Sequence, residues 1–323
     1  MKKGVVPVTV LMSVYNGEPY IREAVESILA QSFRDFEFLI IDDGSTDNSI
    51  SSLKDYRDER LKIIQKPNTG LVDSLNVGLA AATGEWIARM DADDISAPDR
   101  LEKQLTYVKN RPELVLVGTN AVLINNVGEL SWEVRFPEGH SALVNSIANG
   151  GSPFPHASAI FRRESAISLG GYNHRFPDGH DIDFWLRLSD IGQLGCIQEP
   201  LLSLRKHNES FTGCRELYTQ FVSFWAARLL YRRRRLGLTD FAIAGNEEQW
   251  ERFLDSVRKV VNSAGYPMVL EQRAALSSAA YNSGRRDLFW LLPYVGAHPQ
   301  RLLGTLEKPL RWYLKRRLLA TCV

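Results

Sequence analysis

The chain has 323 residues, 44% of them hydrophobic and 24% charged, with a formal net charge of +1. These values exclude a disordered or low-complexity chain and are typical of a folded globular protein. The balanced total hides an asymmetry, because residues 1–214 carry 21 Lys and Arg against 29 Asp and Glu, whereas residues 215–323 carry 18 against 9. We therefore expect two parts with different partners, divided near residue 214.

The cysteines and the apolar runs limit the choice of compartment. Cys196, Cys214 and Cys322 are odd in number and have no metal-like spacing, which favours a reducing environment. The apolar stretch near the N-terminus is short for a signal peptide and fits a first strand. No run reaches the roughly 20 apolar residues that span a bilayer. We therefore expect a cytoplasmic protein.

Strand-like and helix-like segments alternate along the first part of the chain. Residues 8–14 are rich in β-branched side chains, and Pro19 then suits the first turn of a helix with one apolar stripe. Further strands are expected at 36–41, 61–65, 86–90 and 114–118. Further helices are expected after Asp47, over 70–82 and from Ser96 to Val108. This alternation predicts a mostly parallel sheet with helices on both faces.

The pattern is less regular beyond this point. Residues 119–160 mix short strands and turns, and a helix is expected over 181–190. Short strands follow near 194–197 and 201–204. Beyond residue 215 the spacing of apolar residues predicts helices. The sequence therefore predicts an α/β domain followed by a basic helical region.

Aspartates stand just past two of the expected strands and at the start of one expected helix. Asp42 and Asp43 follow the second strand, Asp91 and Asp93 follow the fourth, and Asp181 opens the helix. Ligands of an open parallel sheet bind beyond the carboxyl ends of its strands, so we expect these residues to share one site. Clustered carboxylates repel one another unless a cation is shared among them. Mg²⁺ and Mn²⁺ prefer such oxygen ligands.

Each aspartate group also has an ordinary structural interpretation. Asp42 and Asp43 are residue types that stabilise turns and cap helices. Asp91 and Asp93 lie near the start of a helix, and Asp181 could be an N-cap. Taken one group at a time, these interpretations are at least as well supported as a ligand site. The order of all the motifs along the chain decides between them.

A set of short motifs stands in the order seen in glycosyltransferase family 2, and the chain resembles that family from about residue 7 to residue 212. Any one motif is weak, but the ordered set is specific. The motifs are Val10 to Gly17, Gln31 to Phe33, Asp42 to Asp47, Met90 to Asp94, Pro98 to Leu101, Gly170 to Tyr172 and Asp181 to Leu188. The resemblance implies a Rossmann-like GT-A fold, a nucleotide-diphosphate sugar donor, Mn²⁺ or Mg²⁺, and inversion at the anomeric carbon.

The resemblance also implies roles for individual residues. Tyr15 would line the base pocket, Asp43 would bind the base, and Asp91 would lie near the ribose. Asp93 would hold the metal at the diphosphate, and Asp181 would be the general base for the acceptor hydroxyl. The residues placed at the donor nucleotide are Val14, Tyr15, Asn16, Asp43, Asp91 and Ala92.

His180 departs from the pattern of the family, in which many members have Glu before the catalytic aspartate. The change leaves Asp181 in place but alters what orients it, and it bears on which acceptor is used. Asp183 is the competing candidate for the base. It lies two residues further along a helix and therefore points elsewhere.

A further group of residues has roles that the sequence leaves open. His207 resembles part of a basic segment that closes over the diphosphate in some relatives, and it is a candidate metal ligand. Arg205 and Lys206 are candidates for contacts with the phosphates. For each, an ordinary structural role is the alternative. The candidates for the acceptor side are His156, His180 and Trp185, with the core as the alternative for Trp185.

The C-terminal region combines arginine with aromatic residues. Phe221, Phe224 and Trp225 precede four arginines at 232–235, and the chain ends in a second basic, aromatic segment at 312–319. Apolar faces flanked by arginine suit a helix lying on an anionic membrane surface. The alternative is that these helices pack against the catalytic domain and expose their basic face to solvent. The sequence has no recognisable motif for binding nucleic acid.

We therefore predict an inverting, metal-dependent glycosyltransferase that uses a nucleotide-diphosphate sugar, with uridine the base expected by resemblance. The expected acceptor is a glycan or lipid-linked molecule of cell-surface polysaccharide synthesis. The enzyme would work on the cytoplasmic side, with residues 215–323 at the inner face of the membrane. Two alternatives are a metal-dependent phosphohydrolase or nucleotidyltransferase, and a non-catalytic sugar-binding protein of the same fold.

Overall fold

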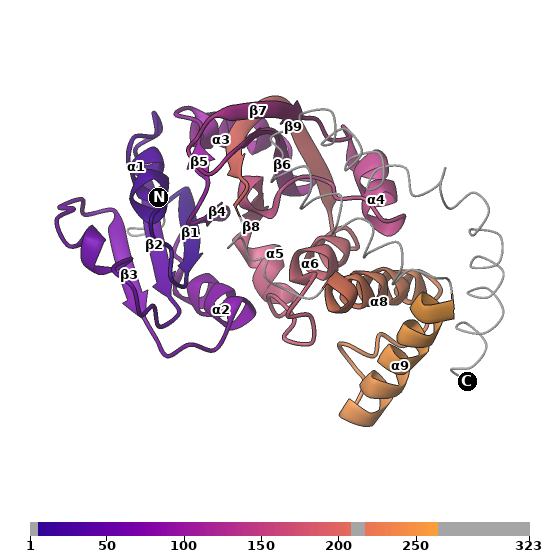
Figure 1. Ribbon diagram of the computed structural model, residues 1–323. Helices are drawn as coiled ribbons and strands as arrows, with labels where there is room; N and C mark the ends of the chain where they lie inside the picture. The colour runs from indigo at the N-terminus through magenta and orange to yellow at the C-terminus, as the bar shows by residue number, and fades with distance from the viewer. Residues whose placement is uncertain (1–5, 208–216, 264–323) are drawn as a thin grey trace. The chain divides into compact units, whose positions relative to one another are not determined.

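The computed structural model describes residues 6–207 and 217–263. The chain forms two compact units, of which the first comprises residues 1–147 and 152–214 and the second comprises residues 148–151 and 215–323. In their described parts, the first unit carries a sheet covered by helices and the second consists mainly of two helices (Figure 1).

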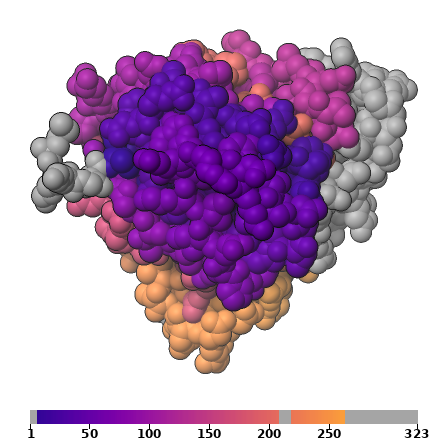
Figure 2. Space-filling view, turned by 90° about the vertical axis from the view of Figure 1, so that its left-hand side faces the viewer, coloured from indigo at the N-terminus to yellow at the C-terminus, as the bar shows by residue number. Residues whose placement is uncertain are grey.

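Four parallel strands form the N-terminal part of the sheet. They are β1 (Val8–Val14), β2 (Phe36–Asp42), β3 (Leu61–Gln65) and β4 (Trp86–Asp91), in the order β3-β2-β1-β4. β1, β2 and β4 are buried along almost their whole length, as their apolar runs predict for strands covered on both faces. In the space-filling view the N-terminal segment that contains these strands, with its helices and loops, forms one continuous indigo and purple face (Figure 2).

The remaining strands make the sheet mixed. They are β5 (Ile95–Ser96), β6 (Leu114–Ile124), β7 (Leu130–Val134), β8 (Ile160–Arg162) and β9 (Gln193–Arg205). β8 runs antiparallel to both β4 and β6, β9 runs parallel to β6, and β5 pairs with β9. The full order is β3-β2-β1-β4-β8-β6-β9-β5, with β7 on β6. β9 thereby brings a late part of the chain to the turn between β4 and β5.

Helices connect the strands of the first unit. They are α1 (Ile21–Leu29), α2 (Leu71–Ala81), α3 (Arg100–Val108), α4 (His140–Ala148), α5 (Arg163–Ser168) and α6 (His180–Leu188), with 3₁₀ turns at Ser51–Leu53 and His156–Ser158.

Alternate residues of β1 face two different helix layers. Val10 and Met12 share a core with Ile21 of α1 and with residues of α3. Leu11 faces α2, where Gly78 approaches so closely that a Cβ atom would lie 2.1 Å from Leu11 Cδ1. The predicted α/β fold with helices on both faces of the sheet is therefore confirmed.

Two local predictions are wrong. The segment after Asp47 forms only a 3₁₀ turn, because the Asp47 carboxylate bonds the nearby N–H groups of Ser49 and Glu18 instead of capping a longer helix. The two short strands expected near 194–197 and 201–204 are one strand, β9, which keeps its pairing with β6 through several register shifts.

The second unit is helical in its described part, with α8 (Leu217–Arg235) and α9 (Glu247–Ser263). The two helices pack on each other. Their buried apolar residues include Ala226, Leu230, Trp250, Phe253 and Val257. The basic segment at 312–319 lies outside the described residues.

The described residues bear on two expectations, the lack of an apolar run that could span a membrane and the reduced state of the cysteines. Over residues 6–207 and 217–263, no helix combines the length and the apolar character needed to cross a membrane. Cys196 is a buried free thiol, and burial raises its pKa to about 12, so it stays protonated at neutral pH. Cys214 and Cys322 lie outside the described residues.

The substitution Gly84→Ala tests the packing of β4 on β1. A Cβ atom at this position would lie 2.3 Å from the Thr9 backbone nitrogen and 2.6 Å from the Val8 carbonyl carbon, so backbone atoms must move. We expect the free energy of unfolding, measured in urea, to fall by about 3 kcal/mol. Ser131→Ala, at an exposed position of β7, is the control and should change it by less than about 0.5 kcal/mol. Equal stabilities of the two variants would contradict this packing.

Candidate functional site

The carboxyl ends of β1, β2 and β4 bring two aspartate groups to one edge of the sheet. Ser13 pairs with Asp91 on one side of β1, and Val14 pairs with Asp42 on the other side. Because the three strands are parallel, the residues that follow them, including Asp43, emerge at the same edge.

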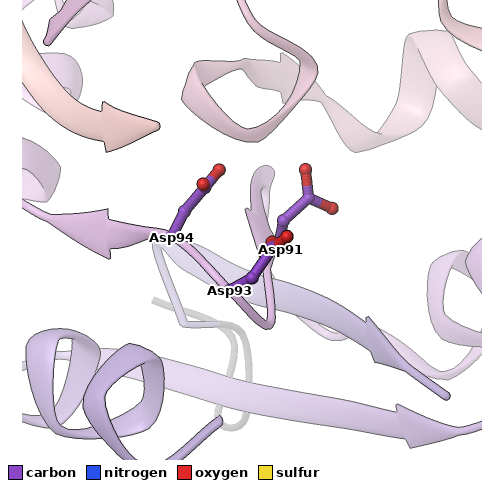
Figure 3. A group of neighbouring side chains, drawn as sticks. All are labelled: Asp91, Asp93 and Asp94. Atoms are coloured by element: carbon purple, nitrogen blue, oxygen red, sulfur yellow. The ribbon is translucent and has the colours of Figure 1, made fainter. Parts of the chain in front are cut away.

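Three carboxylates crowd together on the turn from β4 to β5. Oxygen atoms of Asp91, Asp93 and Asp94 lie within 4.8 Å of one another, and the three side chains project to the same side of the turn (Figure 3). Asp94 is 1% exposed, and its Oδ1 accepts a hydrogen bond from the Arg205 N–H at 2.9 Å. Among the described residues, Asp94 Oδ2 has no hydrogen-bond partner. Ala92 is half-buried against the core.

Burial and mutual repulsion disfavour the charged form of this group. Burial raises the pKa of Asp94 well above its ordinary value, and Asp93 and Asp91 raise it further. Burial also raises the pKa of Asp91, with Arg89 opposing the rise and Asp93 adding to it. A divalent cation would relieve this repulsion. Carboxylate oxygens suit Mg²⁺ or Mn²⁺, and Asp94 Oδ2 is a buried acceptor without a donor, so the residues present fit such an ion.

Two buried arginines support the carboxylate turn, and the sequence prediction missed both. Arg89 and Arg100 are each 0% exposed. Arg89 pairs with Asp91 and donates to the Met90 carbonyl, and Arg100 donates to the Arg89 carbonyl at 2.7 Å. Burial lowers the pKa of Arg100 to about 10, so this guanidinium stays charged at neutral pH. For Arg89, the sequence held one sign of this role, namely a charged residue inside the apolar run of β4.

Arg205, the last residue of β9, holds the turn in place. Its backbone N–H donates to Asp94 Oδ1, and its Nε donates to the Asp93 carbonyl at 2.8 Å. Nη2 pairs with Glu23 of α1, and Nη1 donates to two carbonyls of the β6–β7 turn at 3.3 Å. The side chain is 2% exposed. The donors of Arg205 are directed at protein acceptors, so in this geometry Arg205 supports the turn, which is the structural role that the sequence left as the alternative to a phosphate contact.

The two residues after Arg205 have different surroundings from those of Arg205 itself. His207 Nε2 lies 2.9 Å from Asp93 Oδ2, and its ring centroid lies 4.8 Å from that of Tyr20. Adjacent ligands of an octahedral ion with bonds of about 2.1 Å lie about 3 Å apart. The spacing of His207 and Asp93 therefore fits a shared ion as well as it fits a hydrogen bond. Lys206 is exposed, and its backbone N–H donates to the Ile124 carbonyl at 3.0 Å.

Asn16 ties the end of β1 to the loop after β2. It adopts a φ of 52°, its N–H donates to Ser45 Oγ at 3.0 Å, and its Oδ1 accepts from the Thr46 N–H at 2.8 Å. Val14, at the end of β1, is buried, whereas Tyr15 is 53% exposed. The predicted nucleotide residues of this segment therefore form a fixed backbone with one exposed aromatic ring.

Asp43 is fixed by the loop that follows β3. It is 3% exposed, its Oδ1 accepts from Lys66 Nζ and the Thr69 N–H, and its Oδ2 accepts from the Gly70 N–H at 2.9 Å. A carboxylate oxygen has two lone pairs, so Oδ2 can accept one further donor. The sequence prediction missed Lys66, which follows β3 directly.

The first turn of α6 places Asp181 beside an aromatic cluster. The His180 ring centroid lies 5.2 Å from that of His156 and 5.9 Å from that of Tyr172, and His156 Nε2 lies 2.9 Å from the Tyr172 hydroxyl. Burial lowers the pKa of His156 well below its ordinary value. Burial also lowers the pKa of His180, while Asp181 and Asp91 oppose the change. The charges of both aspartates act on the His180 imidazole, so the start of α6 lies near the end of β4.

Trp185 and Asp183 belong to the interior of the first unit. Trp185 is 0% exposed, and its ring centroid lies 5.4 Å from that of Phe184 and 5.5 Å from that of His156. Asp183 is 1% exposed and pairs with Arg187 at 2.8 Å. Trp185 therefore lies in the core, which was the stated alternative to an acceptor contact, and Asp183 is held by a structural ion pair.

Comparison with known proteins identifies the family. Residues 9–170 match the family described as Glycosyl transferase family 2. EpsE of Bacillus subtilis (strain 168), named as a glycosyltransferase, is 35% identical over 246 residues, which are 72% of this chain and 85% of EpsE. The O-antigen biosynthesis glycosyltransferase WbnJ of Escherichia coli is 33% identical over 232 residues, 70% of this chain and 90% of WbnJ. The chain belongs to glycosyltransferase family 2, and the predicted enzyme class, a glycosyltransferase, is confirmed.

Solved structures agree on the fold. TarS 1-349 of S. aureus in complex with UDP-GlcNAc aligns with a TM-score of 0.57 and 20% identity, covering 76% of this chain and 78% of TarS 1-349. A mannosyltransferase from Pyrobaculum calidifontis in complex with GDP-Man and Mn²⁺ aligns with a TM-score of 0.52 and 21% identity, covering 94% and 85%. The predicted GT-A fold is confirmed.

The substitution Arg205→Met tests the strut of the carboxylate turn. It removes the donors to Glu23 and to the Asp93 carbonyl while keeping an apolar stem. Because Glu23 is 53% exposed and can be resolvated, we expect a loss of about 2 kcal/mol in the free energy of unfolding, below the full cost of breaking a buried pair. Arg135→Met is the control, because Arg135 is 76% exposed and pairs only at the surface with Glu133. Equal losses in urea denaturation would contradict a special role for Arg205.

Proposed function

We propose that this protein transfers a sugar from a nucleotide-diphosphate donor to a hydroxyl group of a glycan or lipid-linked acceptor, with inversion at the anomeric carbon and with Mn²⁺ or Mg²⁺ bound. The observation that carries the proposal is the turn after β4, where Asp91, Asp93 and Asp94 lie within 4.8 Å of one another. The turn stands at the carboxyl edge of the sheet, where open α/β sheets bind their ligands.

The donor nucleotide is proposed to lie along the ends of β1 and β2. Asp43 retains an acceptor site for a base N–H, and the exposed Tyr15 ring offers a face for the base. Asp91, at the end of β4, would accept a hydrogen bond from the ribose. The backbone of this pocket would come from Val14, Asn16 and Ala92. The TarS structure is a complex with UDP-GlcNAc, which supports a uridine donor here.

The metal is proposed to be held by Asp93, with His207 and the neighbouring carboxylates as further ligands. When bound, a divalent ion neutralises the charge that grows on the leaving diphosphate. Arg205 fixes the backbone of Asp93 and the side chain of Asp94, so the ligands are oriented before the ion arrives. Lys206, exposed next to this turn, is the candidate for a phosphate contact. The mannosyltransferase structure is a complex with GDP-Man and Mn²⁺, which supports the choice of ion.

Asp181 is proposed to be the general base. It is half-buried at the start of α6, where the helix dipole favours a carboxylate. Its carboxylate would take the proton of the acceptor hydroxyl while that oxygen bonds to the anomeric carbon and the diphosphate leaves. His180 and His156, whose pKa values burial lowers, would line the acceptor side as neutral imidazoles.

The acceptor and the location complete the proposal. WbnJ is named for O-antigen biosynthesis, which supports a cell-surface polysaccharide as the product. The first unit would be the catalytic domain, working on the cytoplasmic side. The second unit, whose segment 215–323 carries twice as many basic as acidic residues, would meet an anionic membrane surface.

The substitution Asp94→Asn tests whether the carboxylate turn is built for a cation. In EDTA we expect the melting temperature to rise by roughly 3 °C, because the ionised Asp94 is destabilised by burial and by its neighbours. Mn²⁺ should stabilise the wild-type protein and should stabilise the variant much less. Asp35→Asn, at an exposed aspartate, is the control and should respond to Mn²⁺ like the wild type. An equal response of Asp94→Asn and the wild type to Mn²⁺ would contradict the metal site.

The substitution Asp181→Asn tests the general base. We expect kcat for sugar transfer to fall by about a thousandfold with little change in KM for the donor, because only proton removal in the transition state is lost. Release of nucleoside diphosphate in the presence of acceptor is the measurement. Asp190→Asn, at an exposed position in the turn just beyond the end of α6, is the control and should keep wild-type turnover. Wild-type turnover by Asp181→Asn would rule out the assigned role.

A further inference from the structure

We infer that the connection between α8 and α9, residues 236–246, is an apolar tip that inserts into the headgroup region of an anionic bilayer. The inference deepens the proposed membrane partner and rests on that part of the proposed function, not on the chemistry of sugar transfer. The predicted contact of a helix that lies on the membrane through its own apolar face stays a separate prediction.

Three aliphatic side chains stand out of this connection. Leu236 is 60% exposed, Leu238 is 37% exposed and Ile243 is 60% exposed. By contrast, Trp250 and Phe253 of α9 are each 4% exposed, and Phe221, Phe224 and Trp225 of α8 are half-buried. Over residues 217–263, the large apolar side chains that are exposed are therefore on the connection.

The connection is built to hold these side chains outward. Gly237 has a φ of 70°, a left-handed conformation that suits glycine after a helix end. The Leu238 N–H donates to the Arg233 carbonyl at 3.0 Å, and the Gly237 N–H donates to the Arg234 carbonyl at 3.0 Å. These two bonds close the end of α8 and fix the backbone on both sides of Gly237. Leu236 and Leu238 are therefore exposed on an ordered backbone.

The second half of the connection is fixed by side chains of α8. Arg233 Nε donates to the Thr239 carbonyl at 2.9 Å, and its guanidinium carbon lies 4.5 Å from the centroid of the Phe241 ring. Arg234 pairs with Asp240 at 2.6 Å, and Asp240 Oδ1 accepts from the Ala242 N–H. Little conformational entropy remains to be lost when such a segment docks, which favours insertion.

The charges around the tip favour an anionic surface. α8 ends in four successive arginines, and Arg235 is exposed directly before Leu236. The acidic residue of the connection, Asp240, is 8% exposed and is already paired with Arg234. Glu247 and Glu248 begin α9 directly after the connection, so the basic end of the tip is its α8 side. Basic residues beside apolar ones bind anionic headgroups and the acyl boundary together.

The size of the tip favours lipid over a second protein. A stable protein interface buries about 800 Å² on each partner, which three aliphatic side chains on one short connection do not supply. A bilayer imposes no such threshold, because each inserted apolar group and each arginine near the headgroups adds its own contribution. A bilayer is therefore the occupant that this surface fits.

Flotation of the full chain with vesicles tests the inference. We expect wild-type protein to float with vesicles of phosphatidylcholine and phosphatidylglycerol and to stay behind with phosphatidylcholine alone. The double variant L236D/L238D should lose more than about tenfold in partition to the anionic vesicles, because two apolar groups become charged. Val127→Asp, at a 70% exposed aliphatic of the first unit, is the matched control and should float like the wild type.

The outcomes separate the alternatives. Failure of the wild type to float, or equal flotation of L236D/L238D, would overturn the inference. Dimers of the wild type that L236D/L238D converts to monomers would overturn it too, because a second copy would then cover the tip. Transfer of sugar to a water-soluble acceptor should be the same in the wild type and L236D/L238D. If L236D/L238D loses flotation but still transfers sugar, the result bears on the tip alone. If the wild type fails to transfer sugar, the result bears on the proposed function.

Discussion

The crowding of three carboxylates on one short turn is the constraint on which the rest of the catalytic unit depends. Asp91, Asp93 and Asp94 repel one another. The Arg89 guanidinium inside β4 pairs with Asp91, and Arg205 at the end of β9 donates its backbone N–H to the Asp94 carboxylate. These contacts neutralise only part of the charge, because Asp94 Oδ2 has no donor within the described residues. The turn is thus held in a shape that a divalent cation would complete.

The topology explains how this turn is reached from distant parts of the chain. β4 ends at the turn, β5 leaves it, and β9 pairs with β5, so Arg205 arrives beside residues 112 positions earlier. The same strand end delivers His207 to Asp93. On the other side of β1, the ends of β1 and β2 carry Asn16 and Asp43. A nucleotide region and a metal region therefore share one edge of a single sheet.

Much of this fold was predictable because its strands are apolar runs that end in polar residues. The strands of the parallel part were expected almost residue for residue, and the ordered motifs led to the right family. A structural role for Arg205 and a core position for Trp185 were among the stated alternatives. The partners that fix these roles were not predictable, because neighbours in sequence say nothing about acceptors or rings supplied from other elements. Asp94 was passed over because its burial depends on β9. The segment after Asp47 stayed a turn because local side-chain bonds competed with the helix.

The most direct measurement is the anomalous scattering of Mn²⁺ in crystals grown with a nucleoside diphosphate. The account predicts one strong peak within bonding distance of the Asp93 carboxylate, with the diphosphate bound to the same ion and the base beside Asp43. A well-ordered nucleotide at this edge of the sheet without an anomalous peak, or a peak remote from Asp93, would contradict the account.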